Sequence, residues 1–527
     1  MSGQSERTRE LLTRRGDVRE DELERLLSPG HVVVSLSPDV AKKPQAQLTF
    51  SFAVNLLARL YPVVQRLDVV LPLGSPLVAS LPRWPGSNLA DHVRTLLQAL
   101  RPDVEWAVTE LVAATPTCHL VIGTSDPAGP TVFLGADGWE ARLSSERWMV
   151  TGEKVNPVGA YAAACLGVAE VWKRLVHPHT SLFKGVPVVP LEGTLTFSTF
   201  SYRVRTGEPN PDLPPTVAIG SLTIVGAGAG GGAAAFTLAS LHKLTAAIKA
   251  VDPDEINEPN LNRYVFADDD DARARRRKTD LVKELLEARF VGVTVDSVPL
   301  AYDKTRAQLS RSDYEYVLAA VHSRTARRQL QFETPKVLWD GAAGEDGEFR
   351  IWRMVLGVTE CMHCKQPDTN EDPELAKAHQ LDELLGLGTD VWFLKVRDND
   401  AFSQEEAARL AERIQQSALD LKVPLAAQRF SDWEAENCGR LKLSEGDDEI
   451  PIPFAPVMAG VLLAGEIIKE HSFPEAVLDS YYWNTLMGRF LTRTPPARRS
   501  PKTDCSFCHD ADYLAQYERR WGARSTR

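Results

Sequence analysis

Short apolar runs alternate with longer segments of helical periodicity along most of the chain. Four runs of four or five residues, rich in valine, leucine and isoleucine, have the length and composition of buried strands: 31–35, 67–71, 118–122 and 222–225. Between Gln47 and Leu60, the residues Leu48, Phe52 and Leu56 recur on one helical face. Strands that alternate with helices predict α/β domains with parallel sheets.

One helical pattern occurs twice in the chain. The alanine- and glycine-rich stretch 156–173 resembles the stretch 452–469 at a constant offset. Three positions match: Pro157 with Pro453, Glu170 with Glu466, and Lys173 with Lys469. The repeat predicts two domains of one architecture. Chance similarity between two alanine-rich helices is the alternative.

Composition and charge exclude several classes of protein. Hydrophobic residues make up 43% of the chain and charged residues 25%, as in ordinary globular domains. The net charge of −11 argues against a nucleic-acid binder. No apolar run reaches the roughly 18 residues that span a bilayer, and residues 1–7 lack the apolar core of a signal peptide. We therefore expect a cytoplasmic protein that binds neither nucleic acid nor membrane.

Cysteine spacing predicts a metal site. The chain has seven cysteines, and an odd number without an export signal argues against a disulfide framework. Four of them form two Cys-x-x-Cys knuckles, a spacing that suits tetrahedral Zn²⁺: Cys361 with Cys364, and Cys505 with Cys508. The two knuckles predict a structural Cys₄ zinc site that ties distant segments together. Four unrelated buried thiols are the alternative. Cys118 and Cys165 lie in apolar segments, so we expect both in the core.

A glycine-rich loop follows the apolar run 222–225 and leads into an alanine-rich helix. Its glycines include Gly226, Gly228 and Gly231. Glycines let the backbone approach a phosphate or ribose, and the helix that follows directs its positive end at the anion. A second strand ends at Asp252, where an acid can accept hydrogen bonds from ribose hydroxyls. A dinucleotide oxidoreductase uses the same loop, so this pattern alone does not decide the ligand.

Basic residues after the acid favour a triphosphate. Asn260, Arg263 and Lys278 follow Asp252, and an enzyme that attacks an α-phosphate must hold the departing pyrophosphate. This order resembles the adenylation domain of the E1-like activating enzymes, the superfamily of ThiF and MoeB. The resemblance implies that ATP binds with Mg²⁺, that Asp252 holds the ribose, and that the three basic or amide residues hold the phosphates. Asp254 is predicted to lie in the same ATP site.

The repeat has a meaning in this superfamily. There, the repeated helix follows a loop that crosses over the tail of the substrate, so two copies imply two Rossmann-like adenylation-type domains. The first copy lacks the chemistry, because Ser35–Asp39 contains no glycine loop and no Asn-Leu-x-Arg follows the strand 67–71. The predicted segments are an inactive adenylation-like domain (1–205), a linker (206–216), the active ATP-binding domain (217–365), a helical insertion with the catalytic cysteine (366–450), the crossover helix with the second knuckle (451–510) and a basic tail (511–527).

Cys438 is the candidate nucleophile. It lies outside both knuckles among polar residues, with Arg440 nearby to stabilise a thiolate. In the superfamily a cysteine shortly before the crossover helix carries a thioester, so the resemblance implies that role for Cys438. The alternative is an ordinary thiol in an enzyme that stops at the adenylate.

One position departs from the pattern of the superfamily. After the strand 316–320 the superfamily usually places an aspartate that holds Mg²⁺, and this chain has His322 there. Mg²⁺ prefers oxygen ligands, so histidine is a poor substitute. Asp340, at the end of the next strand, is our candidate for the missing carboxylate in the ATP site. Slow or lost adenylation is the alternative.

These observations lead to one hypothesis. The chain resembles an E1-like enzyme that adenylates the C-terminal glycine of a ubiquitin-like protein and passes it through Cys438 to an E2-like conjugating enzyme. Such two-halved chains resemble those encoded in bacterial ubiquitin-like conjugation and antiphage operons. A homodimer or a pseudo-dimer within one chain is expected. The alternatives are a sulfur-carrier adenylyltransferase without thioester relay, an NAD-type oxidoreductase and a catalytically dead scaffold.

Overall fold

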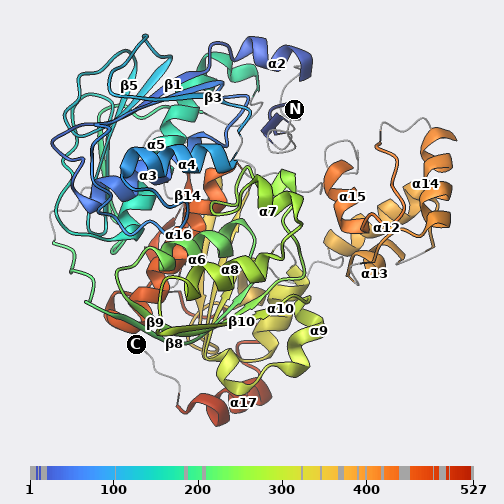
Figure 1. The fold of residues 1–527 in the computed structure, drawn as a ribbon. Helices are drawn as coiled ribbons and strands as arrows, with labels where there is room; N and C mark the ends of the chain where they lie inside the picture. The colour runs from blue at the N-terminus through green and yellow to red at the C-terminus, as the bar shows by residue number, and fades with distance from the viewer. Residues whose placement is uncertain are drawn as a thin grey trace. The chain divides into compact units, whose positions relative to one another are not determined.

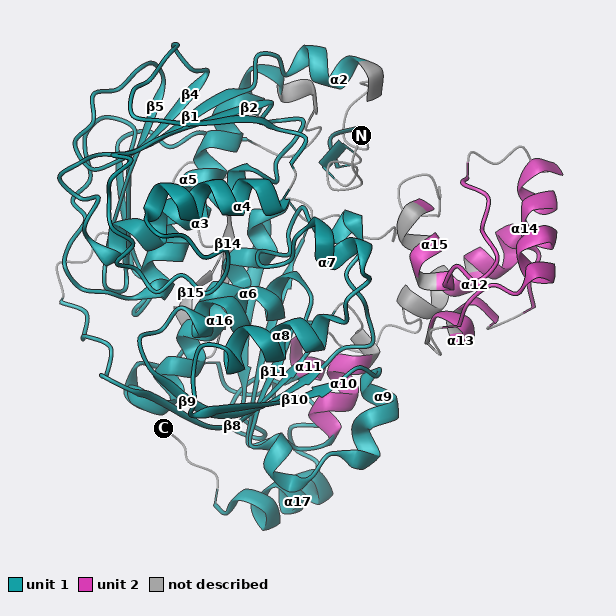
Figure 2. Cartoon of the chain, in the orientation of Figure 1, with its two compact units in different colours: residues 1–321, 333–361, 451–527 teal, residues 322–332, 362–450 magenta. Residues whose placement is uncertain are grey.

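The chain forms two compact units in a computed structural model (Figure 2). Unit 1 contains residues 1–321, 333–361 and 451–527, and unit 2 contains residues 322–332 and 362–450. The structure describes residues 8–9, 11–13, 20–100, 102–182, 188–204, 209–321, 324–344, 347–365, 373–388, 391–397, 400–416, 421–437, 452–478, 480–485, 494–497 and 499–523.

Unit 1 contains two sheets, and the first has seven strands in the order β3-β2-β1-β4-β5-β6-β7. The strands from β3 to β5 are parallel, and β6 and β7 extend the β5 edge in antiparallel fashion. In the register of the central strands, Val33 lies between Asp68 and His119. The bounds are β1 (His31–Leu36), β2 (Arg66–Val70), β3 (Glu105–Thr109), β4 (Cys118–Ile122), β5 (Thr131–Asp137), β6 (Glu140–Ser144) and β7 (Thr194–Ser198).

The second sheet has eight strands in the order β10-β9-β8-β11-β12-β13-β14-β15. Its strands from β10 to β12 are parallel, and β13 to β15 are antiparallel additions. The bounds are β8 (Val217–Val225), β9 (Leu244–Val251), β10 (Val293–Val298), β11 (Tyr316–Ala319), β12 (Val337–Ala343), β13 (Glu348–Met354), β14 (Ser480–Asn484) and β15 (Thr494–Ala497).

The two sheets share one topology. If β8 is matched to β1, the next six strands match in chain order and in sheet position, and the second sheet adds β15. The repeated helix is α5 (Pro157–Val176) in one copy and α16 (Phe454–Ser472) in the other, and each precedes the second antiparallel strand of its sheet. We call residues 20–204 the first half, and the parts of unit 1 after residue 208 the second half. The predicted pair of Rossmann-like α/β domains is thereby confirmed.

Helices cover both sheets, and Figure 1 shows the blue-to-teal first half above the second half. The other helices of the first half are α2 (Glu20–Leu26), α3 (Pro44–Leu57) and α4 (Leu89–Leu100). The second half contains α6 (Ala229–Ala239), α7 (Asp269–Arg273), α8 (Lys278–Glu287), α9 (Tyr302–Thr305) and α17 (Ala511–Trp521). Helix α17 lies in the segment that the sequence describes as a basic tail, and Tyr517 anchors it by donating a 3.0 Å hydrogen bond to the Lys336 carbonyl.

Aromatic side chains join the two halves. The Phe52 ring of α3 stacks on Tyr161 of α5 at 4.1 Å and on Phe236 of α6 at 5.7 Å between centroids. The Tyr161 hydroxyl lies 2.6 Å from the Ser240 hydroxyl of the second half. Such stacked pairs stabilise an interface by about 0.5–1.5 kcal/mol each beyond the area that they bury. The two halves therefore share one continuous core within unit 1.

The repeated Glu-x-x-Lys positions are buried ion pairs. Glu466 and Lys469 of α16 have no exposed side-chain surface, and Lys173 pairs with Glu170 at the matching place in α5. Burial raises the pKa of Glu466 and lowers that of Lys469, and each partner opposes the other's shift. Lys469 also donates a 2.9 Å bond to the Phe200 carbonyl, so a residue of the first half helps to hold α16.

Unit 2 is helical and has an aromatic core of its own. Phe402 stacks on Phe430 at 3.8 Å, and the Trp392 and Trp433 rings lie 5.4 Å apart. The sequence predicts a helical insertion here but not this core, because the aromatic residues are far apart along the chain. The helices are α10 (Arg324–Phe332), α11 (Met362–Lys365), α12 (Pro373–Leu385), α13 (Val391–Arg397), α14 (Gln404–Gln416) and α15 (Phe430–Asn437).

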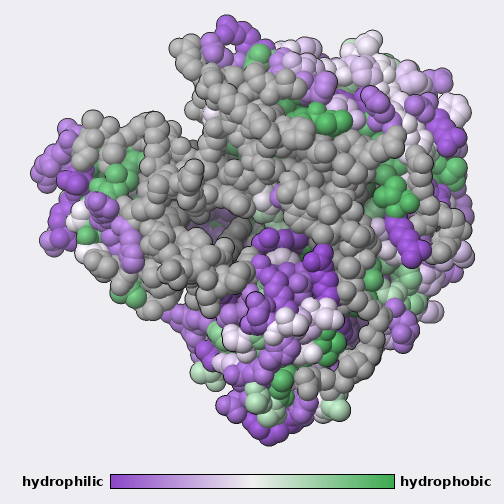
Figure 3. Space-filling model, turned by 180° about the vertical axis from the view of Figure 1, so that it is seen from behind, coloured by the Kyte–Doolittle hydropathy of each residue, from purple (hydrophilic) through white to green (hydrophobic). Residues whose placement is uncertain are grey.

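The described helices are not of the membrane-spanning kind: each is too short or too polar to cross a bilayer. On the face shown in Figure 3, the described hydrophobic residues form small groups among hydrophilic ones. Leu111 is 80% exposed and Val150 69% exposed. Single exposed apolar residues of this kind are normal on protein surfaces.

Candidate functional site

The glycine loop joins β8 to α6 and needs glycine at two positions. Gly226 has a φ of +89°, and a Cβ there would lie 2.6 Å from the Ala320 carbonyl oxygen. A Cβ on Gly231 would overlap the carbonyl oxygen of Gly226. Gly228, the N-cap of α6, differs, because a Cβ there would meet nothing within 4 Å. The loop is therefore tight on its protein side and leaves open space at the helix N-terminus, where an anion is favoured.

Asp252 braces this loop from the end of β9. Its Oδ2 accepts a hydrogen bond of 2.6 Å from the Ala227 amide, and its Oδ1 accepts one of 2.9 Å from the Asp254 amide. Burial raises the pKa of Asp252 to about 6, while Lys278 acts in the opposite direction. An ionised carboxylate has roughly four acceptor positions, so acceptors remain for ribose hydroxyls.

Lys278 begins α8 and is held in place by Asp254. The Lys278 Nζ lies 2.6 Å from Asp254 Oδ2, and the Lys278 amide donates to the Asp254 carbonyl at 3.1 Å. Burial lowers the pKa of Lys278, but the charges of Asp254 and Asp252 outweigh burial, so the net shift is upward. The Lys278 side chain is therefore a cation held in a fixed position. Its partner Asp254 lies closer to solvent, with 53% of its side chain exposed.

Asn260 ends the short η2 turn (Glu258–Asn260), and Arg263 lies on the loop that follows it. The Arg263 guanidinium donates to the Pro259 carbonyl at 3.1 Å and to Asn262 Oδ1 at 2.9 Å. The Asn260 Oδ1 is buried and has no hydrogen-bond partner among the described residues. A buried acceptor without a partner costs about 1–3 kcal/mol, which a hydrogen-bond donor of a bound ligand would recover. Arg263 is close enough to affect the pKa of Lys278, so the structure brings both cations to one place.

The arrangement can bind a nucleotide. The open space beside Gly228 and the acceptors of Asp252 suit a ribose, and the cations Lys278 and Arg263 suit phosphate oxygens. Gly228 and Asp252 follow the carboxyl ends of β8 and β9, where ligands bind in open α/β sheets, and Arg263 and Lys278 come from the segment after β9. The residues present therefore fit ATP.

Asp340 lies two strands away from β8 on the same sheet. It pairs in register with Ala319 of β11, one residue before Ala320, which contacts the glycine loop. The Asp340 side chain has no exposed surface. His322, the other residue considered for the magnesium position, is outside the described residues. The prediction that Asp340 ends its strand is wrong, because β12 continues to Ala343; the buried carboxylate instead lies mid-strand, level with the end of β11.

The four knuckle cysteines meet in one cluster. The sulfur atoms of Cys361, Cys364, Cys505 and Cys508 all lie within 4.8 Å of one another, and all four residues are buried. The Cys361 and Cys505 sulfurs are 3.5 Å apart, near the separation of about 3.8 Å that Zn–S bonds of about 2.3 Å give in a tetrahedron. The cluster therefore fits a zinc ion geometrically. The His363 Nδ1 lies 2.5 Å from Gln331 Nε2. Four thiolates already complete a tetrahedral shell without this histidine.

Removal of one thiol tests this cluster. Cys361→Ser is expected to reduce bound zinc from about one per chain to near zero and to lower the melting temperature by several degrees, because metal binding contributes folding free energy. Metal analysis of the purified protein and a thermal melt measure both effects. Cys165→Ala, which changes a buried thiol of α5, is the control and should retain its zinc. Full zinc content in Cys361→Ser would contradict the site.

Cys438 is outside the described residues, and its environment stays a prediction. Helix α15 ends at Asn437, whose Oδ1 accepts a 2.6 Å bond from the Lys422 amide. The remaining cysteines, Cys118 and Cys165, are buried as the sequence predicts. Burial raises the pKa of Cys118 to about 12 and also raises that of Cys165, so neither thiol is available as a thiolate.

Together, the fold and this site define a nucleotide-binding α/β protein. Residues 218–507, more than half of the chain, match the ThiF family, and the chain belongs to that family. Its fold is that of an E1-like, ATP-dependent adenylyltransferase. Residues 37–177 match the prokaryotic E2 family C. The two cysteines within this second match are the buried Cys118 and Cys165, so neither offers the accessible thiol that an acyl carrier needs.

Similar proteins span much of the chain. An uncharacterized protein of Sinorhizobium fredii, y4jF, is 26% identical over 507 residues, which are 93% of this chain and 91% of the relative. The crystal structure of Escherichia coli MccB with AMPCPP and MccA has 17% identity and a TM-score of 0.33. A structure of the microcin C7 biosynthetic enzyme MccB with N-formylated MccA has 16% identity and a TM-score of 0.32. Each of the two MccB matches covers 55% of this chain, and this chain covers 66% of the first MccB chain and 67% of the second.

Proposed function

We propose that this chain is an E1-like activating enzyme for a ubiquitin-like protein. It adenylates the C-terminal glycine carboxylate of that protein with ATP, receives the acyl group on Cys438 as a thioester and passes it to an E2-like enzyme. The observation that carries the first step is the braced glycine loop with Asp252, Lys278 and Arg263 at one sheet edge of a ThiF-family chain.

The residues around the loop have distinct tasks in the proposed adenylation. The α6 N-terminus and Gly228 accommodate the nucleotide, and Asp252 accepts from its ribose. Asn260, Arg263 and Lys278 hold phosphate oxygens. Cations that are fixed before the reaction stabilise charge in the transition state without reorganisation, and such electrostatic stabilisation usually contributes more to catalysis than any other single effect.

The proposed reaction has two steps. A carboxylate oxygen of the terminal glycine attacks the α-phosphorus, the bond to the oxygen that bridges to the β-phosphate breaks, and pyrophosphate leaves with the bonding electrons. The Cys438 thiolate then attacks the acyl carbon, and AMP leaves as the thioester forms. Thiolate is the reactive form of cysteine, so this step requires a deprotonated Cys438.

Mg²⁺ would accompany ATP in this reaction and neutralise charge on the phosphates. Asp340, in the middle of β12 and level with the end of β11, would supply the oxygen ligand that Mg²⁺ prefers. The residue is fully buried, so we assign it this role only in the nucleotide-bound enzyme.

Two features support a protein partner and a place in a conjugation system. The chain combines a ThiF-family region with a match to a prokaryotic E2 family. The duplicated sheet within unit 1 supports a pseudo-dimer in one chain, with the first half as an inactive adenylation-like domain. We place this system in the bacterial cytoplasm, where ATP is available. An antiphage operon is one genetic setting in which we expect it.

Pyrophosphate exchange tests the proposal. The purified chain is incubated with ATP, labelled pyrophosphate and a small ubiquitin-like protein encoded by a neighbouring gene. Label in ATP that depends on the C-terminal glycine of the partner supports adenylation. Bound nicotinamide without exchange would point to an oxidoreductase, and no exchange with any neighbouring partner would point to a scaffold. Exchange without a thioester would favour the sulfur-carrier alternative.

The affinity for ATP should fall as the pH drops below about 6, the pKa of Asp252. A protonated Asp252 loses acceptor capacity toward the Ala227 and Asp254 amides and toward ribose. The KM for ATP between about pH 5 and about pH 8, at saturating Mg²⁺, measures this effect. Asp252→Asn should bind ATP more weakly but should lack the part of the pH dependence that Asp252 causes. If both proteins showed the same profile, another group would be responsible.

A further inference from the structure

The first half donates hydrogen bonds to the loop that carries Arg263. The Arg59 guanidinium, just past α3, donates to the Leu261 carbonyl and, at 3.0 Å, to the Ala267 carbonyl. Asn55, one turn earlier, donates a 2.7 Å bond to the Val265 carbonyl. Three carbonyl groups between residues 261 and 267 are thus held by two side chains of the other half.

Arg59 and Asn55 form one rigid pair. The Arg59 Nε donates a 2.8 Å bond to Asn55 Oδ1, so each side chain fixes the other. Arg59 is only 1% exposed, and burial lowers its pKa to about 9 while Asp268 opposes that shift. It therefore remains a cation at neutral pH. A buried cation is tolerated only where its donors are used, and all three Arg59 nitrogens donate to the protein.

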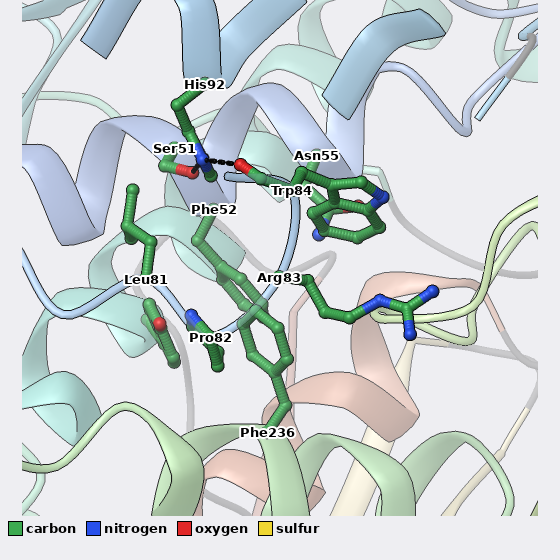
Figure 4. Close-up of a pocket in the computed structure, with 10 residues that line it drawn as sticks. Ser51, Phe52, Asn55, Leu81, Pro82, Arg83, Trp84, His92 and Phe236 are labelled. Atoms are coloured by element: carbon green, nitrogen blue, oxygen red, sulfur yellow. Dashed lines mark hydrogen bonds between the residues drawn. The ribbon is translucent and has the colours of Figure 1, made fainter. Parts of the chain in front are cut away.

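A second contact from the first half lies beside the pair. Arg83 Nη2 contacts Asp268 Oδ2 at 3.0 Å and Asp271 Oδ2 at 2.9 Å, at the start of α7. Asn55 and Arg83 line a cavity of about 10 Å³ together with Phe236 of the second half, and Figure 4 shows these side chains. That volume holds about one water molecule, so the side chains leave little free space at this interface.

The structure assigns Asn55 and Arg59 as positioning residues for the nucleotide site, through which the first half fixes the Asn260–Arg263 loop. This inference rests on the proposed function. Leu261, whose carbonyl Arg59 holds, lies between Asn260 and Arg263 along the chain. The same loop is followed by Tyr264, whose buried ring packs against Phe266 at 4.8 Å. The first half, which has no glycine loop after β1, thereby contributes to the proposed chemistry of the second half.

Variants of this pair test the assignment by kinetics. Arg59→Met is expected to raise the KM for ATP in pyrophosphate exchange by about tenfold or more with a smaller change in kcat, because a misplacement of about 1 Å costs up to about 10²-fold. Asn55→Ala, which removes one of the three carbonyl contacts, should give a smaller increase. Arg59→Lys keeps the charge and should fall between Arg59→Met and the unchanged chain.

A matched arginine separates positioning from stability. Arg289 also links the halves, because it donates to the Ser80 hydroxyl of the first half and, at 3.4 Å, to the Ala239 carbonyl, away from the loop. Arg289→Met should also lower the melting temperature but leave the KM for ATP within about twofold. An unchanged KM in folded Arg59→Met, or an equal rise in Arg289→Met, would overturn the assignment. Absence of exchange and of ATP binding in the unchanged chain would instead contradict the proposed function.

Discussion

Cys438→Ala is expected to abolish the covalent adduct with the ubiquitin-like partner while pyrophosphate exchange continues. Only the thiol at residue 438 takes the acyl group from the adenylate in the proposed mechanism, so its loss stops the second step and spares the first. The adduct is measured on a non-reducing gel after incubation with ATP and partner, and the same sample with added thiol shows whether the bond is a thioester.

Cys438→Ser gives the matched control. A serine hydroxyl can attack the same acyl carbon, although more slowly, and the resulting oxygen ester resists thiols but not alkali. A thiol-resistant adduct in Cys438→Ser would place the acyl group on residue 438 itself. A thiol-sensitive adduct in Cys438→Ala would remove Cys438 from the mechanism. Intact exchange without any adduct in the unchanged chain would leave a sulfur-carrier type of adenylyltransferase.

Lys278→Met is expected to reduce the rate of pyrophosphate exchange by about 10²- to 10³-fold, the range for removal of one fixed group that stabilises transition-state charge. Lys278 is buried, its pKa is raised by Asp254 and Asp252 against the effect of burial, and its ammonium group is held at 2.6 Å by Asp254. Methionine keeps much of the length of the side chain and removes the charge. Initial exchange rates at saturating ATP and partner measure the loss.

Lys283→Met on the same helix is the control for this variant. Lys283 is exposed, so loss of its charge should leave exchange within about twofold. A thermal melt of both variants checks that each is folded. If folded Lys278→Met exchanged pyrophosphate at the rate of the Lys283 control, the nucleotide site would not lie at the end of β9.

The sequence contains enough information to predict the sheets and the cysteine cluster, because their signals are local. The strands are short valine-rich runs, and the repeat at Glu170 and Glu466 correctly indicates two copies of one architecture. The knuckle spacing correctly predicts that four cysteines come together. The glycines and Asp252 are also close in the chain to the strands that position them. They follow the ends of β8 and β9, which are neighbours in the sheet.

Other features could not be predicted, because they depend on contacts between distant residues. Arg59 and Leu261 are 202 positions apart, and nothing in the pattern around Arg59 distinguishes it from a solvated arginine. The bracing of the glycine loop by Asp252 is hidden for a similar reason, since it involves a backbone amide. The aromatic core of unit 2 joins residues from two helices, α13 and α15, and a loop. Roles for Cys438 and His322 remain predictions, since both lie outside the described residues.

Covalent linkage of two copies changes what each copy must conserve. In an assembly of identical subunits, one gene encodes every subunit. A substitution that helps one subunit to support its neighbour therefore also changes the nucleotide site of that neighbour. Here α16 is held by Phe200 of the other half, and the two copies are always present in equal number. Selection can therefore act on the two copies separately, and the first has Ser37 and Asp39 after β1 where the second has Gly226 and Gly228 after β8.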